Sequence, residues 1–327
     1  MRALLFLLST VLLAGCETLS YYGQAAGGQL ALVAKARSVE KVLADEAIPA
    51  DLKERLRVAI GIRDFASREL KLPDHGAYRS YAELGRPYVV WNVVAAPEFS
   101  LQPVQSCFPI AGCVAYRGYY AKKAAEKYAA GLRAAGNDVI VYGVPAYSTL
   151  GWFDDPLLST FIGYADAELA RLIFHELAHQ VVYVKDDSTF NESFAVVVEH
   201  EGLRRYLVGG GRTAEQPRGQ GQFAELVAST RAKLEALYRT RLAPDAMRAR
   251  KRAELEALRP WLATLRGFEG AEPNNAFLAS YATYTDLVPM FERLLAQSQG
   301  DLAAFYGKVK RLASERSSRD PSSAPTR

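Results

Sequence analysis

The sequence has little net charge and no block of like charges, which argues against nucleic-acid binding. Lys and Arg total 40 against 36 Asp and Glu, a formal net charge of +4. No basic run is interleaved with aromatic residues, the pattern expected of a nucleic-acid interface. Charged residues make up 23% and hydrophobic residues 50% of the chain, which excludes wholesale disorder and allows one large domain or two modest ones.

The apolar run at the amino terminus is too short to span a bilayer. The first residues read MRALLFLLSTVLLAGC, with Arg2 ahead of an apolar stretch over residues 4–13. A spanning helix needs about 20 apolar residues, so this stretch is the core of a signal peptide. Leu-Ala-Gly before Cys16 resembles the lipobox of bacterial lipoproteins. That resemblance implies removal of residues 1–15 and a lipid anchor on Cys16, and Glu17 after the cysteine implies the outer membrane, facing the periplasm.

Cysteine is scarce, and only Cys107 and Cys113 remain after Cys16. A four-thiolate zinc site has little support, because there is no second pair and five residues separate these two. Export to an oxidising compartment favours a disulfide between close cysteines. The intervening Phe-Pro-Ile-Ala-Gly is typical of a tight loop, so we expect a Cys107–Cys113 disulfide.

Hydrophobic periodicity predicts an α+β chain that is mostly helical, with a small mixed β-sheet packed on a central helix. Residues 16–28 show little periodicity and predict a tether, and the Ser-rich residues 316–327 predict a disordered tail. Residues 29–315 predict one domain. Its parts are a helical hairpin over 29–71 (helices 29–46 and 51–71), strands 87–96 and 139–142, a helix over 119–135, an edge strand over 145–152, two central helices over 166–207 (166–184 and 189–207), a polar loop over 212–221, and a helical part over 222–314 (222–241, 244–265, 275–297 and 300–314).

Two of the four histidines lie in the motif His175-Glu176-Leu177-Ala178-His179. On a helix, residues four apart share one face, so both imidazoles can bind one Zn²⁺. Glu176 lies beside them as a base for a water at the metal. The surrounding helix is apolar nearly all round, and buried ionisable groups need a partner that a metal would supply. The motif predicts a catalytic zinc site with one ion per chain.

A third ligand is expected on the following helix, where Glu192, Glu199, His200 and Glu201 are candidates. The sequence HELAHQ followed by Asn191-Glu192 resembles the gluzincin metallopeptidases, in which an Asn-Glu pair supplies this ligand. Together with the lipobox, CFPIAGC, YSTLGWFDDP and NESFA, it resembles a family of bacterial lipoproteins described as "putative aminopeptidases". The resemblance implies a zincin-like fold, peptide substrates and Glu192 as the ligand.

The chain departs from the usual gluzincin spacing. Glu192 follows His179 by 13 residues, which is shorter than usual, whereas Glu199 follows it by 20. The two glutamates are about 10 Å apart on a helix, so both cannot bind one ion. Val196 stands where related enzymes carry an acidic residue, which leaves open what orients the ring of His175.

The resemblance also implies a tyrosine or histidine that stabilises the oxyanion, and Tyr284 is the first candidate, with Tyr281 beside it. Pro289 should kink their helix. An edge strand around residues 147–152 would suit a substrate bound as an added strand. Asp154-Asp155 could meet a substrate's amino terminus, but the same residues are ordinary turn formers. The aminopeptidase assignment rests on the family resemblance.

Two other functions fit the sequence. The chain could be a zinc-containing envelope lipoprotein that acts as a scaffold or chaperone-like interaction protein, although a structural zinc site does not need Glu176. It could also hydrolyse amides other than peptides. The sequence does not define the oligomeric state.

Overall fold

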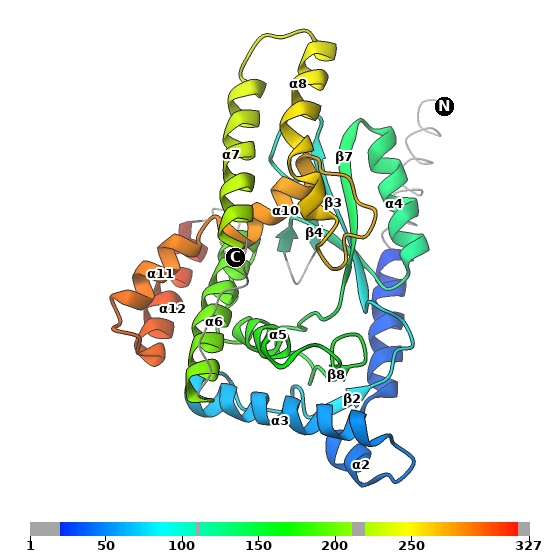
Figure 1. Ribbon diagram of the computed structural model, residues 1–327, viewed down its shortest axis with the longest axis vertical. Helices are drawn as coiled ribbons and strands as arrows, with labels where there is room; N and C mark the ends of the chain where they lie inside the picture. Colours follow the sequence, from blue (N-terminus) through cyan, green and yellow to red (C-terminus); the bar gives the residue numbers. More distant parts are fainter. Residues whose placement is uncertain (1–19, 109–111, 211–219, 320–327) are drawn as a thin grey trace, which may run out of the picture.

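A computed structural model describes residues 20–108, 112–210 and 220–319 (Figure 1). The fold is α+β and mostly helical, as predicted. After a helix over residues 20–35, the elements are β1 (Arg37–Ser38), α2 (Val39–Ala44), α3 (Ala50–Leu70), β2 (Ser80–Ala82), β3 (Val90–Pro97), β4 (Ser106–Phe108), β5 (Gly112–Val114), β6 (Arg117–Tyr119), α4 (Lys122–Ala134), β7 (Asn137–Val144), β8 (Leu157–Leu158), α5 (Asp166–Ala178), α6 (Ser188–Gly209), α7 (Gln220–Tyr238), α8 (Pro244–Glu256), α9 (Arg259–Leu262), α10 (Asn275–Thr285), α11 (Val288–Ala296) and α12 (Leu302–Arg319).

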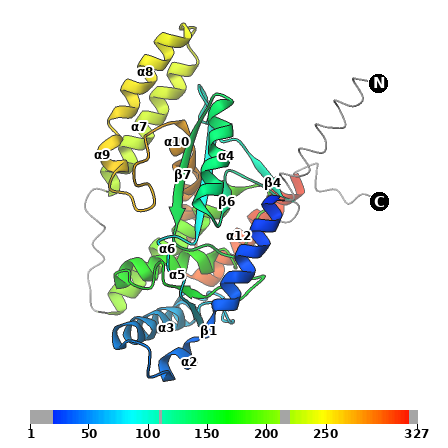
Figure 2. The ribbon, with the colours of Figure 1, turned by 90° about the vertical axis from the view of Figure 1, so that its right-hand side faces the viewer.

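The largest sheet is antiparallel, with strand order β6-β3-β7, and it is covered on both faces. Along β3, alternate residues point to opposite faces. Trp91 and Val93 pack toward α4, whereas Val94 packs toward α10 and the α7–α8 pair. Figure 2 shows this layering of α4, sheet and α10. Burial of both faces explains why the β3 sequence, apart from Asn92, is apolar rather than alternating.

Two smaller sheets complete the β structure. Strands β1, β2 and β8 form a mixed sheet in which β2 pairs antiparallel with β1 and parallel with β8. Strands β4 and β5 pair antiparallel, and Cys107 and Cys113 lie opposite each other and form a disulfide with an S–S distance of 2.03 Å. The backbone N–H of Cys113 donates to Asp186, in the connection between α5 and α6.

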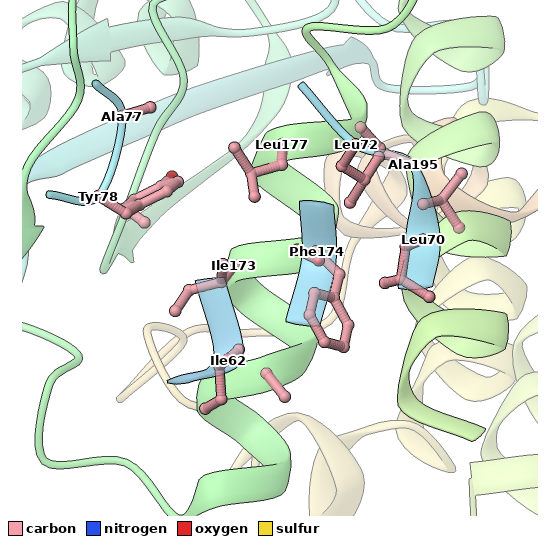
Figure 3. Packing of buried hydrophobic residues seen from close by; sticks show 14 of the residues in the cluster. Ile62, Leu70, Leu72, Ala77, Tyr78, Ile173, Phe174, Leu177 and Ala195 are labelled. Carbon is pink, nitrogen blue, oxygen red and sulfur yellow. The ribbon is translucent and has the colours of Figure 1, made fainter. Parts of the chain in front are cut away.

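The main core surrounds α5 (Figure 3). Ile173, Phe174 and Leu177 are fully buried and pack with Ile62 and Leu70 of α3. Helix α6 completes the core from the other side, and a Cβ on its Gly202 would lie only 2.7–2.8 Å from Leu70 and Phe174. A side chain at this position would therefore force α6 away from α3 and α5.

The predicted tether and helical hairpin at the amino terminus were wrong. Residues 20–35 form a helix in which Tyr21 stacks on Phe108 with ring centroids 5.3 Å apart. A Cβ on Gly28 would collide with the Tyr120 ring, so this glycine allows close packing and does not mark a flexible linker. The predicted helix 29–46 is interrupted by β1, which pairs with β2.

The predicted edge strand over 145–152 was also wrong. Leu150 and Gly151 have φ values of +56° and +82°, which turn the chain. The side chain of Asp155 accepts hydrogen bonds from Thr149 N–H and Oγ1, both at 2.8 Å. These bonds close residues 149–155 into a compact loop in place of an extended strand.

Several predicted helices end earlier or later than expected. Helix α5 ends at Ala178 rather than residue 184, and the predicted helices 244–265 and 275–297 are each divided in two. Pro289 lies in the first turn of α11, where a missing N–H costs nothing, so it begins a helix rather than kinking one. Helix α12 reaches Arg319, so residues 316–319 are not a disordered tail. Residues 1–19 with Cys16, 212–219 of the polar loop, and 320–327 lie outside the described residues.

Helices α7 and α8 form an arm that projects from the body of the molecule (Figure 1). Among the helices of the described ranges, none has both the length and the apolar character needed to cross a membrane.

Candidate metal centre

Helix α5 presents His175 and His179 on one face. Its amino-terminal end is fixed by an ion pair between Asp166 and Arg55 of α3 at 2.7 Å. The helix ends at Ala178, but His179 keeps right-handed helical angles (φ −59°, ψ −19°). The four-residue spacing therefore still places the two imidazoles together, with ring centroids 5.0 Å apart.

Helix α6 delivers Glu192 to the same place after a short connection. Asp187 caps the helix by accepting the N–H of Phe190 at 2.9 Å, and its second oxygen pairs with Arg316 of α12. Asn191 accepts the N–H of Val184 and donates to the carbonyl of Val184, both at 2.8 Å. These bonds turn the chain tightly back and so bridge the short gap between His179 and Glu192.

The three side chains have the spacing of ligands to one ion. Glu192 Oε2 lies 3.2 Å from His175 Nε2 and 3.6 Å from His179 Nε2. The donor atoms of His175, His179 and Glu192 all lie within 4.8 Å of one another. Ligands at 2.0–2.1 Å from a tetrahedral zinc are about 3.3 Å apart. The residues present thus fit a metal ion, and they form a possible three-residue metal site.

Glu199 lies on the other side of the His175 ring. Its Oε2 is 3.0 Å from His175 Nδ1, and its Oε1 accepts Arg171 Nε at 2.6 Å. Glu199 is therefore not placed among the ligands but holds the ligand histidine by its second nitrogen. This contact answers the open question of what orients His175. His200 is exposed, and Glu201 forms surface ion pairs with Arg204 and Arg205.

Burial and charge act against each other on the titrating groups of the site. Burial raises the pKa of Glu176, and the nearby histidines only partly offset this. Burial alone would raise the pKa of Glu192 as well, but His179 and His175 together hold it well below its usual range. Burial alone would lower the pKa of His175, yet its bonds to Glu192 and Glu199 raise it well above 6.5. A metal ion at Nε2 would take the place of that proton.

The comparison with protein families adds an independent finding. Residues 20–322 match the family described as "Putative aminopeptidase". The chain belongs to this family. No curated protein and no solved structure shows a significant match to the chain. The family match covers every residue of the metal site and begins after Cys16, so it adds nothing about the signal segment.

In this member of the family, tyrosines surround Glu192. Tyr284 of α10 lies with its ring centroid 6.1 Å from that of His175. Burial raises the pKa of Tyr284 well above 10, and the charges of Glu192 and Glu176 add to this effect. Tyr281, the other candidate, instead packs on Phe223 with ring centroids 5.4 Å apart, away from the histidines.

Sequence reasoning missed the other tyrosines of the site. The charge of Glu192 also raises the pKa of three hydroxyls that burial already raises, those of Tyr116, Tyr142 and Tyr183. Tyr284 lies close enough to Tyr142 to lower the pKa of Tyr142, against the larger effect of burial. These residues come from a loop, from β7 and from the segment after α5, so no spacing in the sequence associates them.

A second carboxylate lies near Glu176. Asp155, favoured in the sequence as a turn former, does close its loop by accepting hydrogen bonds from Thr149. It is nevertheless only 4% exposed, and the charge of Glu176 affects its ionisation. The structure therefore places Asp155 both in a turn and beside the site.

Proposed function

We propose that the chain is a zinc-dependent peptidase of the HExxH type that acts as an aminopeptidase. His175, His179 and Glu192 would hold one Zn²⁺, with Glu176 as general base. The observation that carries this proposal is the convergence of three donor atoms, from His175, His179 and Glu192, within 4.8 Å of one another. Membership of the aminopeptidase family supports a peptide as substrate.

Two imidazoles and one carboxylate are a donor set that suits zinc. The Nδ1 of His179 is buried without a hydrogen-bond partner in the described part of the chain, whereas its Nε2 faces Glu192 Oε2 at 3.6 Å. When bound, Zn²⁺ supplies Lewis acidity, which acidifies a water and polarises a peptide carbonyl.

Glu176 has the properties of a general base. Within the described ranges its carboxylate forms no ion pair or hydrogen bond, so it is free to accept a proton from the attacking water. Burial raises its pKa toward the pH at which the reaction would run, which improves proton transfer in both directions. Glu176 can then give the proton to the leaving amine.

Tyr284 is the proposed oxyanion donor. Its hydroxyl stays protonated at any physiological pH, because burial and the carboxylates raise its pKa. A protonated hydroxyl in a buried site can donate a hydrogen bond to the negative oxygen that develops on the carbonyl. Its ring lies beside that of His175, so it lies at the reaction centre of the proposed mechanism.

We also propose that the protein is held at the bacterial outer membrane through lipid on Cys16 and faces the periplasm. The lipobox-like sequence before Cys16 supports this anchor. The Cys107–Cys113 disulfide suits an oxidising compartment. Peptides in the periplasm would then be the substrates.

The test compares metal content and cleavage of a mixed peptide library for the full chain and for Glu176→Gln. We expect one zinc per chain in both, and a loss of about 10²–10⁴-fold in rate for the variant, as for removal of a general base. Cleavage from the amino terminus would show as loss of single residues from that end.

Two results would contradict the proposal. If the folded wild-type protein binds no zinc, the proposed metal site is wrong. Zinc in both proteins without cleavage by either would favour the alternative of a zinc-containing scaffold or chaperone-like lipoprotein.

A further inference from the structure

The loop of residues 148–155 lies against the end of the metal-binding helix. A Cβ placed on Gly151 would lie 3.9 Å from Cγ of Gln180, the residue after His179. The carbonyl of Asp155 accepts the N–H of Tyr78 at 2.7 Å, and Tyr78 packs in the same core as Leu177 (Figure 3). The loop therefore lies next to the metal motif and is fixed to the core at its carboxyl-terminal end.

Asp155 is the unusual residue of this loop. It is only 4% exposed, and its two oxygens accept the N–H and the hydroxyl of Thr149, each at 2.8 Å. Among the residues that the structure describes, no Lys, Arg or His nitrogen lies within 4.0 Å of this carboxylate. Neighbouring Asp154, by contrast, is exposed and lies 3.9 Å from His75.

A buried carboxylate without a cation is unfavourable, and a turn does not need it. An asparagine at position 155 could accept the N–H of Thr149 equally well and would carry no charge. Burial raises the pKa of Asp155 to about 6, and the charge of Glu176 adds to this. The negative charge therefore serves something other than the loop, and a ligand cation would offset its cost.

The hydrogen bonds from Thr149 leave acceptor capacity for such a cation. A carboxylate has about four lone-pair positions, and Thr149 uses two. Gln180 provides a second sign of a ligand, because both atoms of its side-chain amide are buried without a partner in the described ranges. A peptide group of a substrate could donate to and accept from this amide.

We propose that Asp155 binds the free α-ammonium group of the substrate and so restricts the enzyme to bonds at the amino terminus. This inference rests on the proposed peptidase function and names the feature of the substrate that is recognised. A chain end held at Asp155 lets only the first bonds of a peptide reach Glu176. An N-acetylated peptide carries no cation and would leave the carboxylate unpaired.

The experiment measures binding rather than turnover, with the zinc-loaded full chain carrying Glu176→Gln. The probes are tetra-alanine with a free amino terminus and its N-acetylated form, titrated by calorimetry at pH 7.5. We expect the free peptide to bind about ten- to a hundredfold more tightly, as for a hydrogen-bonded charge pair. Adding Asp155→Asn should abolish this preference, whereas adding Asp154→Asn, the matched control, should keep it.

A pH series gives a readout that a structural role of Asp155 would not move. The preference for the free peptide should decline as Asp155 becomes protonated, at or below pH 6, because Glu176→Gln removes one of the charges that raise the pKa of Asp155 to about 6. Any general effect of pH on the metal site changes the affinity for both peptides equally. It therefore cancels in the ratio of the two dissociation constants.

The outcomes separate this inference from the function on which it rests. Equal binding of the two peptides, or a preference that survives Asp155→Asn, would overturn the role of Asp155. If the wild-type enzyme also cleaves N-acetylated peptides internally, the peptidase proposal stands and the amino-terminal anchor does not. If neither peptide binds and wild type cleaves nothing, both proposals are wrong.

Discussion

Oε2 of Glu199 lies 3.0 Å from Nδ1 of His175, on the opposite edge of the ring from the nitrogen that faces Glu192. Arg171 holds Glu199 in place from α5. The ring of His175 thus contacts two carboxylates, Glu192 among the candidate metal donors and Glu199 on the opposite edge of the ring.

We therefore predict that Glu199→Gln weakens zinc binding by about 10–100-fold, the usual effect of losing such an outer partner. A neutral glutamine side chain at position 199 cannot stabilise the positive charge of the metal through the His175 ring. The substitution also removes the carboxylate that pairs with Arg171. Competition with a chromophoric chelator measures the change. Glu201→Gln is the control, because Glu201 pairs with Arg204 and Arg205 and, within the described ranges, has no contact with His175 or His179. Equal affinities for the two variants would show that Glu199 does not support the ligand.

Asn191→Ala should destabilise the protein and weaken the site together. The side chain of Asn191 is buried and satisfies both backbone groups of Val184. Leaving two buried backbone groups unpaired should cost about 2–4 kcal/mol. Urea denaturation of the metal-free protein measures this loss, and a zinc titration should show weaker binding because Glu192 is the next residue. A change of less than about 0.5 kcal/mol would mean that the turn is held by other contacts.

Asp155→Asn should stabilise the protein at high pH. The pKa of Asp155 is about 6 in the fold against 3.8 for an ordinary aspartate. The folded state therefore holds the proton more tightly than the unfolded state, and the aspartate loses stability as the pH rises from 4 through 6. The rise in pKa corresponds to about 3 kcal/mol in favour of the asparagine at pH 8.

The comparison of urea denaturation at pH 8 and pH 4 tests this prediction. The gain in unfolding free energy from Asp155→Asn should be small at pH 4. At that pH, Asp155 of the wild-type protein binds a proton in the folded state and to a large extent in the unfolded state as well. Asp154→Asn serves as control and should show no such dependence on pH. A variant that is less stable than wild type at pH 8 would show that the carboxylate serves the loop.

Arg63→Met should lower the free energy of unfolding by about 3 kcal/mol or more. Arg63 is completely buried and donates to the carbonyls of Pro73 (2.8 Å), His75 (3.2 Å) and Ala77 (3.0 Å). The loop that contains these three carbonyl groups positions Tyr78 beside Asp155. Arg68→Met on the exposed side of the same helix should change stability little. Similar denaturation midpoints for the two variants would contradict this role of Arg63.

Local patterns in the sequence predicted the parts of the site that lie on one or two helices. The spacing of His175 and His179 requires only that α5 be helical, and the Asn191-Glu192 pair needs only the next helix. Strand β3 was predicted because it is rich in β-branched and aromatic residues. The two central helices were expected to hold the zinc between them, because the third-ligand candidates lie on the helix that follows the His-Glu-Leu-Ala-His motif.

The remaining features depend on contacts between distant segments. Tyr142 and Tyr284 meet because α10 packs on both β7 and α6, and neither strand nor helix signals this by itself. Residues 20–28 were misjudged as a tether because their glycines suggested flexibility, whereas Gly28 admits the ring of Tyr120. For Asp155 a contact with the substrate's amino terminus was considered, but a turn was favoured, because turn formation alone explains an Asp-Asp-Pro sequence.

The ion pair of Asp187 with Arg316 connects the last described helix to the start of α6. The same aspartate caps the helix that carries Glu192. Proteolytic trimming of the carboxyl-terminal end before residue 316 would therefore remove a brace from the helix that carries the candidate ligand Glu192 without touching His175, Glu176 or His179. Under the proposed function, zinc retention would then distinguish intact from clipped molecules, and a protease that cuts α12 would set the lifetime of the zinc-bound form.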